Sequence, residues 1–508
     1  MKKIINFMMV VGTLGLLLPA CSLDKFPTDR IVSETAFQTF EDAVRFHNGI
    51  YNELRRCHYG VFTTTSELMS DLFNARSEFG NRGGMVHRLQ PDFATSYEVR
   101  DIWGNAFSSI AQINNFLDNI GKVENLTPTQ QTSVNNFIAE AHYARAFLYT
   151  LLAGHYTYPY SAANRNTPDL GLPLVSTFDI QQRPGRATIE ETFQFILRDI
   201  EAAEKVGRTG APNERRVSLD AVHALKARVL FMMGNNAGAA QYANLVINTN
   251  RYPLVTTEAA LRTMWRNDLS TEDIFVLHVT ATAFGTSAIG AGANYNDGTT
   301  YSANHGTGGG MGIFAGFNAG LNAYQPDFIP TQTVLDLYEA SDFRLNVFFS
   351  DPAEQVIQIV TPVPGVRFLY KFRGNPALGV MYLHSPKVHR IAEMYLIAAE
   401  AGQNLARLNE LRVARGATAL PAWDEEELRK EWVREFVGEG FRIQCLRRWG
   451  IGYNGRVPQN QNVVDNFGST EFTHRHVTPD QLYRFTLPIP PNDLRNNRNM
   501  KQTPSWVL

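Results

Sequence analysis

Apolar residues recur at steps of three and four along most of this chain of 508 residues. This spacing places them on one face of an α-helix, so the sequence predicts a series of amphipathic helices. The clearest stretches are residues 37–54, 103–120, 137–151, 189–200, 219–233, Val388–Gln403 and Leu405–Val413. Because these helices come in pairs, we expect a stacked array of the tetratricopeptide type, although no regular consensus repeats along the chain.

A glycine-rich segment interrupts the helical pattern. Eleven glycines fall within the 45 residues from Ala281 to Gln325, a density that excludes a long helix. Tyrosine, phenylalanine and asparagine residues lie between the glycines, as in a surface loop that presents flat faces and amide groups to a ligand. The alternative is an insertion whose aromatic residues pack on its own body. A short buried strand, Asp273–Val279, is predicted just before it, and a small β element within Val356–Leu369.

The N-terminus has the pattern of an exported protein. Lys2 and Lys3 precede an apolar stretch, Met8–Leu18, which is too short to span a bilayer. Leu18-Pro19-Ala20-Cys21 then resembles the lipobox of bacterial lipoproteins. The resemblance implies that residues 1–20 are a signal peptide and that Cys21 is lipidated and becomes the mature N-terminus. Ser22, in place of an aspartate, favours the outer membrane.

Composition and motifs argue against several classes of function. The 47 basic and 49 acidic residues give a formal net charge of −2, which argues against nucleic-acid binding. The three cysteines are too few and too widely spaced for a disulfide framework or a zinc cluster. We find no convincing catalytic, metal-binding or cofactor motif. The glutamates between Glu425 and Glu439 fit an exposed helix with i,i+4 pairs, Glu425 with Arg429 and Glu426 with Lys430, better than a catalytic acid pair.

An ordered series of motifs resembles the SusD/RagB family of outer-membrane nutrient-binding lipoproteins, over nearly the whole chain. The segments that carry the resemblance are Cys21–Thr28, Phe40–Ala43, Asn48–Tyr51, Glu140–Tyr149, Gly171–Leu174, Arg390–Ala401, Leu408–Gly416, Arg434–Glu435, Glu439–Arg442, Leu446–Gly450, Leu487–Pro490 and Asn499–Pro504. Cys445 departs from the family pattern, which usually has an aspartate there.

The resemblance implies a mainly α fold, in which four tetratricopeptide-like helix pairs support a loop-rich ligand face with minor β elements. It places one domain over residues 21–508, with the helical scaffold mainly at 34–260 and 386–450 and a loop-rich insert at 270–385. It also implies a protein without enzymatic activity or cofactor, lipid-anchored in the outer membrane and facing the cell exterior. Such a protein captures a nutrient and passes it to a SusC-type TonB-dependent transporter.

Most of the motif residues on helices are expected to serve the scaffold rather than the ligand. These are Arg145, Glu393, Glu400, Arg442 and Trp449. Ligand residues are expected on two loops that face the transporter together. The candidates are Phe79, Asn81, Arg82 and Tyr97 in the first and Tyr295, Tyr301, Asn304 and Tyr324 in the second. An oligosaccharide or polysaccharide is the first expectation for the ligand; a peptide is the alternative, and a glycosidase activity the third.

Overall fold

The computed structural model describes residues 36–58, 60–76, 83–89, 93–279, 314, 317–318, 323–324, 326–351, 365–372, 385–460 and 476–506. Cys21 and the signal segment lie outside these residues. Within the described part of the chain, no helix is both long enough and apolar enough to span a bilayer.

The described chain is mainly helical, as predicted. Its α-helices are α2 (Phe40–Arg56), α3 (Val61–Met69), α4 (Gly84–His87), α5 (Tyr97–Asn119), α6 (Pro128–Tyr156), α7 (Ile189–Ala203), α8 (Leu219–Met232), α9 (Asn236–Ile247), α10 (Glu258–Asn267), α13 (Gln332–Leu335), α14 (Arg344–Phe348), α15 (Ile391–Gly402), α16 (Leu405–Ala414), α17 (Glu425–Phe436), α18 (Arg442–Trp449) and α19 (Pro491–Asn496). Short 3₁₀ helices are η1 (Phe93–Thr95), η2 (Ile120–Lys122), η7 (Pro479–Phe485) and η8 (Pro504–Trp506).

The strands are short and pair two by two in antiparallel fashion. β1 (Phe73–Ala75) pairs with β5 (Phe328–Pro330), and β2 (Asp273–Val276) pairs with β6 (Lys387–Arg390). β3 (Phe317–Asn318) pairs with β4 (Ala323–Tyr324), and β7 (Tyr453–Asn454) pairs with β8 (His476–Val477). Each sheet among the described residues therefore has only two strands.

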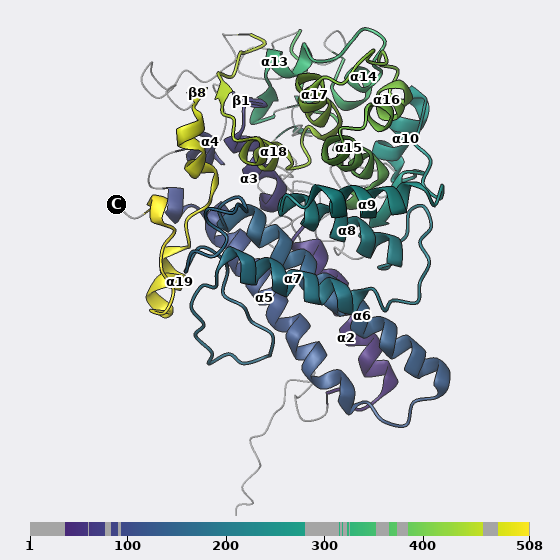
Figure 1. Ribbon diagram of the computed structural model, residues 1–508, viewed down its shortest axis with the longest axis vertical. Helices are drawn as coiled ribbons and strands as arrows, with labels where there is room; N and C mark the ends of the chain where they lie inside the picture. Colours follow the sequence, from purple (N-terminus) through teal and green to yellow (C-terminus); the bar gives the residue numbers. More distant parts are fainter. Residues whose placement is uncertain are drawn as a thin grey trace, which may run out of the picture.

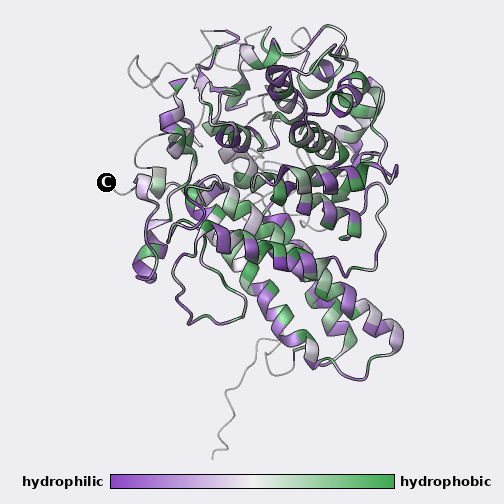
Figure 2. Ribbon diagram, viewed as in Figure 1, coloured by the Kyte–Doolittle hydropathy of each residue, from purple (hydrophilic) through white to green (hydrophobic). Residues whose placement is uncertain are grey.

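Successive helices pack side by side in a stacked array. α5 packs on α6, α6 on α7, α7 on α8, α8 on α9, α9 on α15 and α15 on α16. In Figure 1 the array runs from α2, α5, α6 and α7 in the lower half through α8 and α9 to α15, α16 and α17 at the upper right. Polar and apolar residues mix along the same helices (Figure 2), as expected when each helix has one buried face and one solvated face.

Local sequence signals determine where many of these helices begin. Thr188 accepts a hydrogen bond from the Glu191 N–H (3.0 Å), and the Glu191 carboxylate accepts one from the Thr188 N–H (2.8 Å). This reciprocal capping box satisfies backbone donors that the first turn of α7 leaves without a partner. Thr39 at α2 and Thr127 at α6 form the same arrangement.

The predicted start of one helix is wrong. We expected a helix from Val388, whereas Lys387–Arg390 forms strand β6 and α15 begins at Ile391. All four residues of β6 are buried, and they pair with β2, which confirms a strand within the predicted Asp273–Val279, although it ends at Val276. The apolar spacing does not change between β6 and α15. The pairing with β2, which is distant in sequence, is what makes Lys387–Arg390 a strand and not the first turn of the helix.

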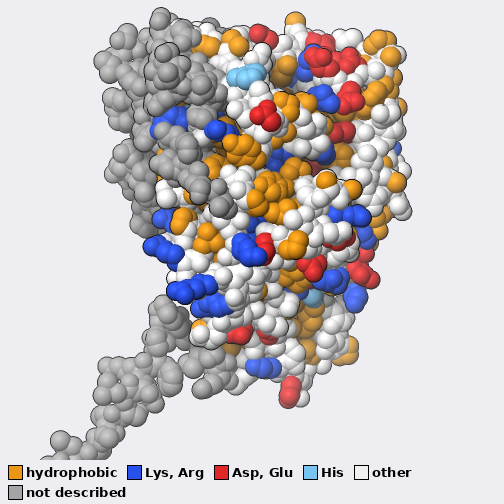
Figure 3. Space-filling view, turned by 60° about the vertical axis from the view of Figure 1, so that its left-hand side comes forward, with side chains coloured by type: hydrophobic (Ala, Val, Ile, Leu, Met, Phe, Trp, Pro, Cys, Tyr) orange, Lys and Arg blue, Asp and Glu red, His pale blue; other side chains and the backbone are white. Residues whose placement is uncertain are grey.

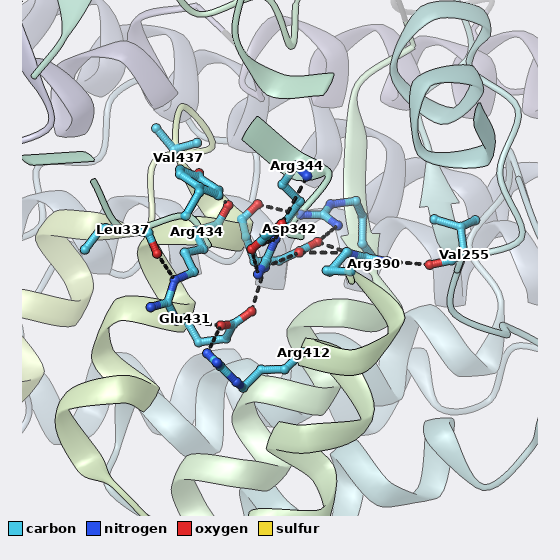
Figure 4. A network of polar contacts seen from close by, with 12 residues as sticks. Val255, Leu337, Asp342, Arg344, Arg390, Arg412, Glu431, Arg434 and Val437 are labelled. Atoms are coloured by element: carbon cyan, nitrogen blue, oxygen red, sulfur yellow. Dashed lines mark hydrogen bonds and ion pairs between the residues drawn. The ribbon is translucent and has the colours of Figure 1, made fainter. Parts of the chain in front are cut away.

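Five arginines and their carboxylate partners form a buried network between α14, α16 and α17 (Figure 4). Glu435 accepts from Arg390 (2.8 Å), from Arg415 (2.9 Å) and from Arg344 (3.1 Å). Glu431 accepts from Arg344 (2.6 Å) and also from Arg412 and Arg434. These opposite charges hold the pKa of Glu431 below its ordinary value and that of Glu435 well below it, despite burial.

The glutamates of α17 therefore divide into two groups, which corrects the prediction of a uniformly exposed helix. The first turn is exposed, and its expected pairs are present: Glu425 with Arg429 at 2.5 Å and Glu426 with Lys430 at 3.1 Å. Glu431 and Glu435 are fully buried. Because removing one member of a buried ionic network leaves its partners uncompensated, this cluster ties the C-terminal helices into one arrangement.

The residues predicted to serve the scaffold do so. Arg145 makes a bidentate pair with Asp199, with both N–O distances at 2.7 Å. Glu393 accepts two bonds from Arg228, Arg442 makes a bidentate pair with Asp71, and Glu400 accepts from Arg448 and from the Trp449 indole N–H. Each of these contacts joins segments that are distant in sequence.

Candidate functional site

The β1–β5 ladder brings the two predicted ligand segments to one place. Ala75 lies opposite Phe328 in the ladder. Just beyond it, the Arg76 N–H donates to the Asp327 carbonyl oxygen (2.9 Å), and Arg76 Nε donates to the Pro326 carbonyl oxygen (2.7 Å). The first segment leaves this ladder after Arg76, and the glycine-rich segment enters it at Pro326. The two segments therefore meet at their ends.

Tyr97 lies close to this junction. Its hydroxyl accepts a hydrogen bond from the Gly83 N–H (3.1 Å), immediately before α4. His87 at the end of α4 packs edge-on against Phe328 of β5, with ring centroids 4.9 Å apart. Tyr97 is 38% exposed, and Tyr483 has the same exposure among the described tyrosines. An exposed aromatic face beside two converging segments has the form of a ligand-stacking platform.

Buried polar groups support this edge of the molecule. Ser96 caps α5 by accepting from the Val99 N–H, and Glu98 follows in the first turn of the helix. Glu98 is buried, and burial raises the pKa of its carboxyl group. His87 Nδ1 lies 2.8 Å from the Leu68 carbonyl oxygen, and Arg456 donates to the His87 carbonyl oxygen (2.9 Å). The junction therefore sits on a rigid base.

The other candidate ligand residues are only partly described. Phe79, Asn81, Arg82, Tyr295, Tyr301 and Asn304 lie outside the described residues. Tyr324 is described through its backbone, which pairs with Phe317 in the β3–β4 ladder. Phe314, from the same segment, is buried with its ring centroid 4.4 Å from that of Phe73 in β1. The assignment of these side chains to a ligand site stays a prediction.

The surface near the C-terminal elements carries charges of both signs. Figure 3 shows the side on which β8 and α19 lie in Figure 1, with hydrophobic side chains near its centre and basic and acidic side chains around them. Such a surface has no single-sign field of the kind that recruits a nucleic acid. It agrees with the near-zero net charge of the chain.

The described residues meet the requirements of neither metal binding by a cluster of side chains nor thiol chemistry at neutral pH. There, no three side chains of histidine, cysteine, aspartate or glutamate are placed to hold a metal ion. Cys57 and Cys445 are both buried, and burial raises their thiol pKa values to about 12 and about 11. Such thiols stay protonated and unreactive at neutral pH. Cys445 lies 3.8 Å from Arg448 Nη2, where a carboxylate would make a stronger pair.

Two family models match the chain. The model of the SusD family matches residues 368–506, and the model described as "Starch-binding associating with outer membrane" matches residues 25–231. Together they include α2, α5, α6, α7 and α15 to α17, and they leave residues 232–367, which contain α9 and the glycine-rich segment, between them.

Individual relatives agree with these models. The starch-binding protein SusD of Bacteroides thetaiotaomicron is 33% identical over 144 residues, which make up 27% of this chain and 24% of that protein. The match thus spans about a quarter of the curated relative.

Solved structures share the fold over almost the whole chain. A SusD superfamily protein from Bacteroides thetaiotaomicron superposes with a TM-score of 0.75 at 21% identity, covering 92% of this chain and 100% of the other. A laminarin-binding SusD-like protein gives 0.67 at 20% identity, covering 92% and 100%. The surface glycan-binding protein A of Bacteroides fluxus gives 0.68 at 18% identity, covering 92% and 99%. Since the two family models match the N-terminal and C-terminal parts of the chain, the chain belongs to the SusD/RagB family.

Proposed function

We propose that this protein is a lipoprotein of the outer membrane that binds a glycan at the cell surface and delivers it to a SusC-type TonB-dependent transporter. It acts by binding, without catalysis. The names of its relatives support a carbohydrate ligand: one is a starch-binding protein, one a laminarin-binding protein and one a surface glycan-binding protein. The lipobox-like segment ending at Cys21 supports attachment to a membrane by a lipid.

One structural observation carries the location of the proposed site. Exposed Tyr97 lies beside the β1–β5 ladder, where the segment after Arg76 and the segment before Pro326 meet. Sugar rings present apolar C–H faces that stack on aromatic rings, and their hydroxyl groups pair with amides and arginines. The candidates Tyr295, Tyr301, Asn304 and Tyr324, with Phe79, Asn81 and Arg82, would supply these groups around Tyr97.

The test compares two exposed aromatic residues at opposite ends of α5. Tyr97→Ala removes the ring at the N-terminal end. Phe178→Ala removes a ring that is 43% exposed. The backbone N–H of Phe178 donates to Asp118, which places this residue near the C-terminal end of α5. The 22 steps of α5 separate these ends by about 33 Å. We expect Tyr97→Ala to weaken binding of the best polysaccharide from a panel several-fold, by calorimetry, since one stacking ring contributes about 0.5–1.5 kcal/mol.

Phe178→Ala should leave the affinity unchanged, and both variants should keep the melting temperature of the parent protein. The panel includes soluble starch, laminarin and a mixture of peptides. Equal affinity of the parent and of a triple variant lacking Tyr97, Tyr295 and Tyr301 would place the glycan elsewhere. If the protein binds peptides but no polysaccharide, the ligand is a peptide. If it hydrolyses a polysaccharide, it does not act by binding alone.

A further inference from the structure

A pocket opens where the N-terminal and C-terminal halves of the chain meet. Its walls come from α3, α6, α8, the start of β6 and the turn that leads into α18, and its volume is about 100 Å³. None of the residues lining it belongs to the candidate ligand face, since Tyr97, Arg76 and Pro326 are not among them. α18 packs against α3 at this place, so the pocket lies at a contact between segments more than 370 residues apart, such as Glu67 and Gly440.

Part of the wall is apolar. Phe62 of α3, Leu151 of α6, Met232 of α8, Val388 of β6 and Phe441 line it. Phe62 and Val388 are buried, whereas Leu151, Met232 and Phe441 are partly exposed. A concave, mostly apolar surface that also holds a few polar groups is typical of a small-molecule site.

The charged groups of the pocket are already compensated. Arg228 is paired with Glu393 through two bonds of 2.5 and 2.7 Å, and Lys387 donates to Asp268 (3.1 Å). Glu439 accepts from Lys371 (2.5 Å) and from Arg390 (2.7 Å). Because each charge has an opposite charge beside it, an ionic ligand would gain little there and would lose its hydration.

The two histidines of the pocket are neutral at physiological pH. Burial lowers the pKa of His58 to about 3 and that of His155 to about 4. Neither therefore adds a positive charge that would attract an anion. The pocket thus favours an uncharged ligand.

Three polar groups are available to such a ligand. His155 Nε2 lies 3.1 Å from the Phe62 carbonyl oxygen and donates its proton there, which makes Nδ1 a hydrogen-bond acceptor. The Ser66 hydroxyl has no hydrogen-bond partner among the described residues, although Ser66 is only 2% exposed and His155 only 6%. Because Ser66 lines the pocket, its hydroxyl can exchange hydrogen bonds with a ligand or a water that enters there. The Thr63 hydroxyl, which donates to the His58 carbonyl oxygen (3.2 Å), still has lone pairs to accept a bond.

We infer that this pocket is a second binding site, for a small neutral hydroxylated compound of the size of one sugar ring. The ring enters by one edge, because the pocket's volume of about 100 Å³ is smaller than that of an engineered cavity of about 150 Å³ that binds benzene. Its hydroxyl groups donate to His155 Nδ1 and exchange hydrogen bonds with Ser66 and Thr63, while its C–H surface contacts Phe62 and Phe441. The inference does not rest on the glycan-binding face.

The experiment uses D-glucose, D-galactose and myo-inositol as neutral probes and D-glucuronate as a charged probe of the same ring size. Binding to the purified soluble domain is measured by saturation-transfer NMR. We expect at least one neutral probe to bind with a Kd on the order of 1 mM, as is usual for ligands of about twelve heavy atoms. Glucuronate should bind at least about tenfold more weakly, because its charge loses hydration without gaining a partner.

Two substitutions at one position separate pocket binding from folding. Ser66→Ala removes this hydroxyl and should weaken binding of the neutral probe about three- to tenfold without lowering the melting temperature. Ser66→Leu fills the pocket and should abolish binding of the probe. Ser133→Ala, at a half-buried site on α6 where the hydroxyl bonds only to its own helix, is the matched control and should change neither quantity.

The outcomes are distinct from those of the glycan test. Ser66→Leu should leave polysaccharide binding intact, and Tyr97→Ala should leave binding of the neutral probe intact. Absence of saturable binding by every neutral probe would mean that the pocket holds water only and would overturn the inference. Binding that survives Ser66→Leu, or glucuronate binding as tight as that of glucose, would overturn it as well.

Discussion

At the scale of single residues, Glu67 of α3 has an environment that should make stability depend on pH. Its side chain is fully buried, and Oε1 accepts from the Gly440 N–H (2.6 Å), whereas Oε2 has no hydrogen-bond partner among the described residues. Burial raises its pKa from 4.5 to about 8, against the opposing effect of Lys371. Glu67 is therefore protonated in the folded protein at neutral pH.

The sign of the pH dependence follows from this raised pKa. Between pH 4.5 and 8 the folded state holds a proton on Glu67 that the unfolded state releases, so the free energy of unfolding falls as the pH rises. Burial lowers the pKa of His58, His155 and His389, which acts in the opposite direction but only below 6.5. Burial lowers the pKa of Lys371 from 10.5 to about 8, which raises stability only above that pH. The interval from 6.5 to 8 therefore excludes the effects of the buried histidines and of Lys371, and Glu67→Gln identifies the part that belongs to Glu67.

We predict that the free energy of unfolding falls over this interval by at most about 1.4 kcal/mol per pH unit, and that Glu67→Gln removes the fall. Glutamine keeps the oxygen that accepts from Gly440 and imitates the protonated acid. Urea denaturation at three pH values measures the slope, with Glu425→Gln on the exposed first turn of α17 as the control. A slope in Glu67→Gln equal to that of the parent would show that Glu67 is ionised in the folded state.

At the scale of elements, the turn between α17 and α18 is shaped by glycine. Gly438 has φ +82°, and a Cβ atom there would lie 2.6 Å from Leu369 Cδ2 and 2.9 Å from Phe372 Cε2. Gly450, which ends α18, has φ +67° but no neighbouring atom within 4 Å of such a Cβ. The two glycines thus share the left-handed backbone and differ in their packing.

We predict that Gly450→Ala costs about 1–2 kcal/mol, the strain of the left-handed conformation alone. Gly438→Ala should cost about 1–3 kcal/mol more, because its methyl group overlaps two buried side chains. Chemical denaturation of both variants measures the difference. Equal losses would mean that Leu369 and Phe372 move aside without cost, and that the packing of this turn does not require glycine.

At the scale of the whole molecule, the proposed function requires attachment to a membrane. Cys21 is the proposed attachment site, and the first described helix, α2, begins at Phe40. We predict that Cys21→Ser moves the protein from the membrane fraction to the soluble fraction, or leaves the precursor uncleaved, while the folded domain keeps its melting temperature. Cys57→Ser, at a buried thiol, is the matched control and should stay with the membranes. If Cys21→Ser stays in the membrane fraction and keeps its lipid label, the assignment of Cys21 is wrong.

The sequence alone determined most of the helical array and the family. Helices such as α5 and α7 follow from apolar spacing and capping residues within the helix itself, and these are local properties. The candidate site was predicted only in part. Composition pointed to the glycine-rich segment, and of the candidate side chains in the two segments Tyr97 is the one that the structure describes as exposed.

Only the tertiary structure decided the features that depend on distant partners. Lys387–Arg390 is a strand because β2 lies beside it, and Glu435 is buried because Arg344, Arg390 and Arg415 converge on it from other elements. The meeting of Arg76 with Pro326 and the pocket around Ser66 likewise join segments hundreds of residues apart. Local spacing along a chain carries no information about such contacts, because they depend on how complete helices pack against one another.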